Sequence, residues 1–99
     1  MASIKNYLNF VLEQLSGLNE ISVRPMMGEF IIYYHGKVVG GIYDDRLLIK
    51  TFKSAKALMP RAVYEVPYSG AKEMILVDSE DDKKFLERLF EAIYSDFST

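Results

Sequence analysis

The sequence contains no cysteine and a single histidine, His35. The absence of cysteine excludes disulfide bonds and thiolate metal sites, and it fits a reducing compartment such as the cytoplasm. Continuous apolar stretches are short, and none approaches the ~20 residues that a membrane-spanning helix requires. Residues 1–7 lack the basic start and the apolar run of a signal peptide. We therefore expect a cytoplasmic protein with no membrane partner.

An excess of one charge is also missing, because 12 basic and 14 acidic residues are mixed along the chain and give a net charge of −2. Such a chain has no overall attraction to nucleic acid, although a local basic patch remains open. Apolar and aromatic residues are plentiful, at 49% and 13%. A disordered chain would be poorer in both. The length fits one folded domain, which we expect to span residues 1–99.

Two amphipathic helices are predicted, one near each end of the sequence. The first spans about residues 3–15, with Ser3 as its N-cap and Ser16-Gly17 as its stop. The last starts at the capping-box-like residues 79–82 and continues to about Phe97. Their apolar stripes are Ile4, Tyr7, Leu8, Val11, Leu12 and Leu15 in the first, and Phe85, Leu86, Leu89, Phe90, Ile93 and Tyr94 in the last. A short helical turn at 54–58, capped by Ser54, is expected between strands.

The middle of the chain changes to the two-residue period of β-strands. Turns are predicted at His35-Gly36 and Asp44-Asp45. Pro25 lacks a backbone donor and favours an edge or a bulge, while Gly40-Gly41 indicates a bulge or a close backbone approach. The predicted strands span about residues 21–27, 29–34, 37–43, 46–51, 62–66 and 72–77.

Two helical stripes need a sheet face to cover them. The predicted fold class is therefore α+β, a two-layer sandwich in which an antiparallel sheet of about five strands carries both terminal helices on one face. The other face needs a cover or serves as an interaction surface. Its candidate residues are Tyr33, Tyr43, Phe52, Tyr64 and Tyr68.

Four short segments, in this order and spacing, carry a resemblance that extends over about residues 4–97. They are Val23-Arg24-Pro25-Met26-Met27-Gly28, then Ile32-Tyr33-Tyr34-His35-Gly36-Lys37, then an acidic turn and an apolar strand at Asp44–Lys50, and finally Val66-Pro67-Tyr68 before the last strand. They resemble the N-terminal domain of the TfoX/Sxy competence regulators. The resemblance implies a two-layer α+β fold similar to type III secretion chaperone-like domains, and it supplies no catalytic residue or cofactor. Those regulators continue into a second, helical domain that this sequence of 99 residues does not include, so a binding role is implied and competence itself is not.

No group of residues predicts an active site. His35 lies in a predicted turn, where a polar residue is expected, and Asp44-Asp45 and Glu80–Asp82 are explained as a turn and a helix start. The glycine spacings of phosphate-binding loops and the ligand spacing of an EF-hand are missing. We expect no catalytic residues, no bound cofactor and no metal site.

Seven residues are candidates for an interaction site: Arg24, Met26, Met27, Tyr33, Arg46, Lys50 and Lys53. Arg24 beside the apolar pair Met26-Met27 suggests an ion pair with a carboxylate that fixes the first strand; a ligand role is the alternative. The two methionines suggest core filling or, as the alternative, an adaptable binding surface.

A basic series without an intervening acid is formed by Arg46, Lys50, Lys53, Lys56 and Arg61. It is interpreted as ordinary charged surface or as a contact for phosphate or an acidic partner.

Three functions remain open at this stage. The first is a protein-interaction module of the TfoX-like regulatory type, with an unidentified protein partner or a second copy bound at the uncovered sheet face or an edge strand. The second is weak nucleic-acid binding through the basic series. The third is an enzyme built from carboxylates, tyrosines or Arg24, in a pocket that sequence cannot show. The sequence favours the first.

Overall fold

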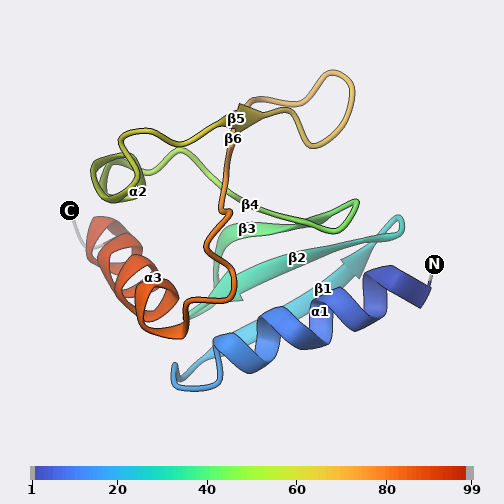
Figure 1. Ribbon diagram of the computed structural model, residues 1–99, viewed down its shortest axis with the longest axis horizontal. Coiled ribbons are helices and arrows are strands. Elements are labelled where there is room, and N and C mark those ends of the chain that lie inside the picture. Colours follow the sequence, from blue (N-terminus) through green and yellow to red (C-terminus); the bar gives the residue numbers. More distant parts are fainter. Residues whose placement is uncertain (1, 98–99) are drawn as a thin grey trace.

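The structure is a computed structural model that describes the backbone of residues 2–97 and the side chains of residues 5–97 (Figure 1). Its helices are α1 (Ala2–Gln14), α2 (Lys53–Leu58) and α3 (Lys83–Phe97), none long and apolar enough within residues 2–97 to cross a membrane. Its strands are β1 (Ile21–Met26), β2 (Glu29–Tyr34), β3 (Lys37–Tyr43), β4 (Arg46–Ile49), β5 (Tyr64–Glu65) and β6 (Met74–Leu76). The predicted α+β class is confirmed, although β5 and β6 are shorter than the sequence suggested.

All strand pairs are antiparallel, in the order β1-β2-β3-β4-β6-β5. β1 therefore lies at an edge, as Pro25 predicted. The first four strands form a meander closed by Met27-Gly28, His35-Gly36 and Asp44-Asp45, with positive φ at both residues of each pair. Positive φ at both central residues is the geometry of type I′ turns, whose twist matches that of the sheet. The predicted turns at His35-Gly36 and Asp44-Asp45 are confirmed.

The sheet is irregular beside Gly40, where the sequence predicted a bulge. Ile32 pairs with Gly40, and the next residue, Tyr33, pairs with Val38, so Val39 is an extra residue in β3. Gly40 is buried and pairs with Ile49 of β4. Because Gly40 has no side chain, the backbones of β3 and β4 can approach closely at this point.

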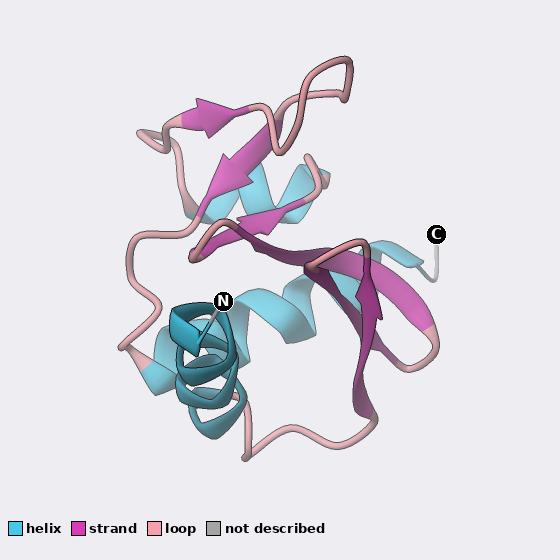
Figure 2. Ribbon diagram, turned by 90° about the vertical axis from the view of Figure 1, so that its right-hand side faces the viewer, coloured by secondary structure: helices cyan, strands magenta, loops and turns pink. Residues whose placement is uncertain are grey.

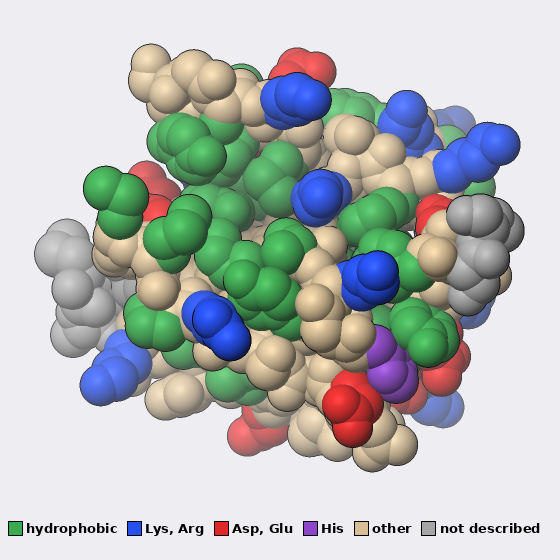
Figure 3. Space-filling model, turned by 180° about the vertical axis from the view of Figure 1, so that it is seen from behind, with side chains coloured by type: hydrophobic (Ala, Val, Ile, Leu, Met, Phe, Trp, Pro, Cys, Tyr) green, Lys and Arg blue, Asp and Glu red, His purple; other side chains and the backbone are tan. Residues whose placement is uncertain are grey.

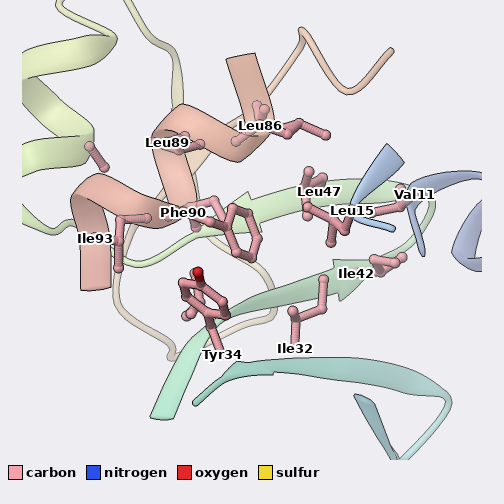
Figure 4. Packing of buried hydrophobic residues seen from close by; sticks show 14 of the residues in the cluster. Val11, Leu15, Ile32, Tyr34, Ile42, Leu47, Leu86, Leu89, Phe90 and Ile93 are labelled. Atoms are coloured by element: carbon pink, nitrogen blue, oxygen red, sulfur yellow. The ribbon is translucent and has the colours of Figure 1, made fainter. Parts of the chain in front are cut away.

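Helices α1 and α3 cover one face of the sheet and bury the main core between the two layers (Figures 1 and 2). The fully buried residues of this core with the largest side chains include Leu15 and Val11 of α1, Ile32, Ile42, Leu47, Ile49 and Ile75 of the sheet, and Leu86, Leu89, Phe90 and Ile93 of α3. Figure 4 shows Phe90 pointing toward Tyr34, and their ring centroids lie 5.9 Å apart in an edge-to-face arrangement. Both terminal helices therefore occupy one face, as predicted.

The helix starts differ from the prediction. Helix α2 begins at Lys53, so Phe52 is its N-cap residue and makes no side-chain cap hydrogen bond. Ser54, the predicted cap, instead donates its backbone N–H and its hydroxyl to Oδ2 of Asp96 in α3, at 3.0 and 2.8 Å. A carboxylate 42 residues away thus performs the capping role that a local side chain usually has.

Helix α3 starts at Lys83, and Oδ1 of Asp82 caps it by accepting the backbone N–H of Phe85 at 3.1 Å. Glu80, expected within a capping box, accepts a hydrogen bond from the Tyr7 hydroxyl at 2.6 Å and so links the segment before α3 to α1. The side chains of Ser3 and Ile4, the predicted cap and first stripe residue of α1, lie outside the described residues.

Replacing Asp96 with asparagine is expected to destabilise the protein at neutral pH. The backbone N–H of Ser54, and then its hydroxyl, lower the pKa of Asp96 below its ordinary value of 3.8. A carboxyl whose pKa is lower in the folded state stabilises the fold above its unfolded pKa, and this contribution is lost as pH falls through the folded pKa. Urea unfolding should therefore show a gap between wild type and Asp96→Asn at pH 7 that closes below about pH 4.

The exposed acid Asp81 provides the control, because no hydrogen bond or ion pair to its carboxylate is present among the described residues. Asp81→Asn should unfold like wild type across the same pH range. A gap for Asp96→Asn that stays constant down to pH 3 would contradict the role given to the carboxylate charge.

Candidate interaction surface

The sheet face opposite the helices, here called the open face, carries a second, smaller apolar cluster. Ile31, Tyr43, Leu48 and Met74 are its buried members, with Tyr33 and Leu76 packed against them. Seen from behind Figure 1, hydrophobic side chains gather in the middle of the molecule, with Lys and Arg side chains between and around them (Figure 3). The chain therefore presents an apolar surface with basic residues on the side away from α1.

Two hollows on the open face share the rings of Tyr43 and Tyr68, whose centroids are 6.3 Å apart. The groove, of about 520 Å³, lies between β3, Lys50-Thr51 and the segment that leads into β6, and its charged lining residues are Lys50, Lys72 and Glu73. The hairpin hollow, of about 350 Å³, is lined by Met26, Met27, Glu29, Tyr43 and Tyr68. Burial, with Tyr68 and Glu29 nearby, raises the pKa of Tyr43, so its hydroxyl stays neutral at physiological pH.

The two methionines of the β1–β2 hairpin are exposed, 48% for Met26 and 96% for Met27. The prediction that they fill the core is therefore wrong. Met27 has φ of 52°, a left-handed conformation that costs a residue with a side chain about 1–2 kcal/mol. Asn, Asp or Gly is the usual residue at this turn position. Neither burial nor turn preference explains a methionine at this position. A role for its exposed thioether would explain it.

Arg24 does not form the predicted ion pair with a carboxylate. It is exposed, and its guanidinium carbon lies 5.8 Å from the centroid of the Tyr33 ring. Its cross-strand partner is Ile31, a member of the open-face cluster, so Arg24 and Tyr33 both belong to this face. The sequence pattern missed this contact because a cation–π pair across two strands depends on their register.

The basic series is divided by the fold. Arg46 is paired with Glu65 and also donates to the carbonyl of Tyr43 at 3.1 Å. Lys50 lines the groove with its ammonium 5.8 Å from the Phe52 ring centroid. Lys53 and Lys56 lie on α2, and Arg61 lines a separate small hollow after it. One of the five charges is thus neutralised and the rest are spread over several elements.

Two of the aromatic residues expected on the open face lie elsewhere. Phe52 packs against the main core and contacts Phe97 edge-on, with centroids 5.3 Å apart. Tyr64 pairs with Ile75, a main-core residue, and therefore projects from the helix side of the sheet. Tyr33, Tyr43 and Tyr68 lie on the open face as expected.

His35 has a packing contact in its turn. Its ring stacks on Tyr94 of α3 with centroids 4.2 Å apart and lies 4.4 Å from the Tyr34 ring. Across the described residues, no group of three or more His, Asp or Glu side chains is arranged to hold a metal ion. The stacking explains how the turn is tied to α3.

The family model for the TfoX N-terminal domain matches residues 13–92, which run from the end of α1 into α3. The chain belongs to the TfoX N-terminal domain family. It is also similar to the uncharacterized 12.7 kDa protein in the trpE 5′ region of Spirochaeta aurantia, with 31% identity over 91 residues that make up 90% of this chain and 79% of that protein. No solved structure matches it significantly.

Membership in the TfoX N-terminal domain family supports a domain of regulatory type. The first two segments that carry the resemblance lie in the first two hairpins of the sheet. Val23–Gly28 forms the end of β1 and its turn, and Ile32–Lys37 forms the β2–β3 hairpin. The matched region includes every residue that lines the hairpin hollow.

Sequence reasoning missed Glu29 and Lys72 as residues of the surface. Glu29 joins it by pairing with Met26 at the end of the hairpin, and Lys72 joins it because the segment before β6 folds back toward Tyr43. No local pattern signals either placement.

Proposed function

We propose that this chain is a non-enzymatic protein-interaction module of the TfoX-like regulatory type, whose partner binds the open face. The single observation that supports this most strongly is Met27, which is 96% exposed in a left-handed turn conformation beside an apolar hollow. Strained backbone retained beside a cavity is a feature of functional sites. The regulatory setting we attach to it is transcription control or competence for DNA uptake, which is the setting implied by the family.

The chemistry of the open face supports a protein partner. Aromatic residues, methionine and arginine are enriched at the centres of protein interfaces, and Tyr43, Tyr68, Met26, Met27 and Arg24 provide all three kinds here. Methionine is unbranched and polarizable, so it adapts to the shape of a partner. Arg46, the first residue of the basic series, is neutralised by Glu65, which weakens the case for a phosphate-binding patch.

Replacing Met27 with asparagine separates stability from binding. The change creates Asn-Gly, the preferred type I′ pair, so we expect the free energy of unfolding to rise by about 0.5–1 kcal/mol. It also removes the exposed thioether, so we expect capture of a partner from cell extract to fall at least about fivefold, as for loss of a contributing interface residue. Urea unfolding and quantitative affinity capture measure the two effects.

The matched control is Asp45→Gly, which relieves a second positive φ but lies outside the lining of both hollows. It should raise stability by a similar amount and leave capture unchanged. Light scattering on the wild type shows whether the retained partner is a second copy. A strict monomer that retains no protein, or that shifts nucleic acid at low salt until Lys50 and Lys53 are replaced by glutamate, would contradict the proposal.

A further inference from the structure

Among the described residues, no cation forms an ion pair with the carboxylate of Glu29. Glu29 is partly buried, lines the hairpin hollow, and forms no ion pair or hydrogen bond through its side chain with any described residue. The ion pair Arg46–Glu65 lies on another part of the sheet. A carboxylate that lines a hollow without a partner of its own can pair with a complementary cation from outside the chain.

The remaining lining of the hairpin hollow suits the stem and the charge of a basic side chain. Tyr43 and Tyr68 present two aromatic rings, and Met26 and Met27 add two thioethers. Aromatic faces attract ammonium and guanidinium groups, while long basic side chains pack their methylene stems on apolar surface. The volume of about 350 Å³ lies at the lower end of the range for ligand pockets and suits one side chain.

The neighbouring groove has the opposite charge balance. Its charged lining residues are Lys50, Lys72 and Glu73, with net charge of +1, whereas Glu29 is the charged residue lining the hairpin hollow. Both hollows share Tyr43 and Tyr68, so one extended segment can occupy the two together. Charge complementarity then orients that segment.

We infer that the hairpin hollow binds a lysine or arginine side chain of the partner protein, in a segment whose nearby acidic residue lies in the groove against Lys50 and Lys72. This inference rests on the proposed function and specifies the chemistry of the partner. The Glu29 carboxylate pairs with the cation, the Tyr43 and Tyr68 rings face it, and the two methionines cover its stem.

The test uses the full chain and two capped peptides. One contains lysine, two apolar residues and glutamate in that order; the other has norleucine, which keeps the stem without the charge, in place of lysine. Amide NMR titration should shift the resonances of residues 26–29 and of Tyr43 and Tyr68, with the lysine peptide binding at least about fivefold more tightly. In Glu29→Gln the two peptides should bind equally.

Glu73→Gln is the matched control, because Glu73 lines the groove but not the hairpin hollow; it should keep the preference for lysine. Equal binding of the two peptides to wild type, a preference that survives Glu29→Gln, or binding of n-butylammonium as tight as that of the peptide would overturn the inference. If Met27→Asn abolishes protein capture while Glu29→Gln retains it, the proposed function stands and this inference fails. If the wild type captures nothing, both fail.

Discussion

Replacing Gly40 with alanine is expected to cost about 3 kcal/mol of folding free energy, a large part of the 5–15 kcal/mol that stabilises an ordinary domain. Gly40 is buried in β3, and a Cβ atom there would lie 2.9 Å from Cα of Ile49 and still closer to the carbonyl oxygen of Leu48. Both atoms are backbone, so a rotamer change cannot relieve the clash. The β3–β4 ladder has to open instead, and urea unfolding should show the loss.

Val38→Ala is the comparison for Gly40→Ala, because Val38 lies two residues away on the same strand and its side chain is exposed. Its stability should stay within about 1 kcal/mol of wild type. If Gly40→Ala proves as stable as Val38→Ala, the close approach of β3 and β4 described above is wrong.

Truncating Phe90 to alanine is expected to destabilise the protein by about 3–5 kcal/mol. Phe90 is fully buried among residues of α1, α3 and the sheet, and its ring meets Tyr34 edge-on. Truncation loses the burial of the ring and leaves a cavity that surrounding backbone elements cannot close. Thermal unfolding followed by circular dichroism should show a midpoint lowered by at least about 12 °C for a domain of this size.

Phe10→Ala makes the same chemical change at an exposed position of α1. We expect it to cost clearly less than Phe90→Ala, since the Phe10 side chain is 40% exposed and leaves no enclosed cavity on truncation. Similar losses for the two phenylalanines would show that the layer between α3 and the sheet is not the main source of stability.

The sequence predicted the elements whose signal is local. The apolar stripes of α1 and α3 repeat every three to four residues, and the type I′ turns at His35-Gly36 and Asp44-Asp45 were indicated by turn-forming dipeptides. The cap of α2 was missed because its acceptor, Asp96, lies 42 residues from Ser54 in sequence. No sequence pattern within one segment can indicate a contact between residues that lie so far apart in the chain.

The candidate surface was only partly predictable, for the same physical reason. Met26 and Met27 were expected to be buried because apolar side chains usually are, whereas a hairpin tip exposes whatever residues form it. Tyr33 and Tyr43 were among the candidates for the uncovered face, and the strand register puts both on it. The hairpin hollow exists because Tyr68, from a segment without regular structure, comes within 6.3 Å of Tyr43. That contact depends on tertiary folding.

Pro25 has a consequence for solubility. In a two-residue hairpin the closing pair, Met26 and Glu29, exchanges both backbone hydrogen bonds, so N–H groups at alternate positions of β1 point away from β2. Pro25 occupies one of these outward positions and has no N–H to offer, which leaves Ile21 and Val23 as the outward donors of β1. A free edge with so few donors is a poor template for strand-by-strand polymerisation. The protein can therefore expose apolar side chains beside this edge while further copies of the chain pair poorly with β1 and do not extend the sheet into a fibril.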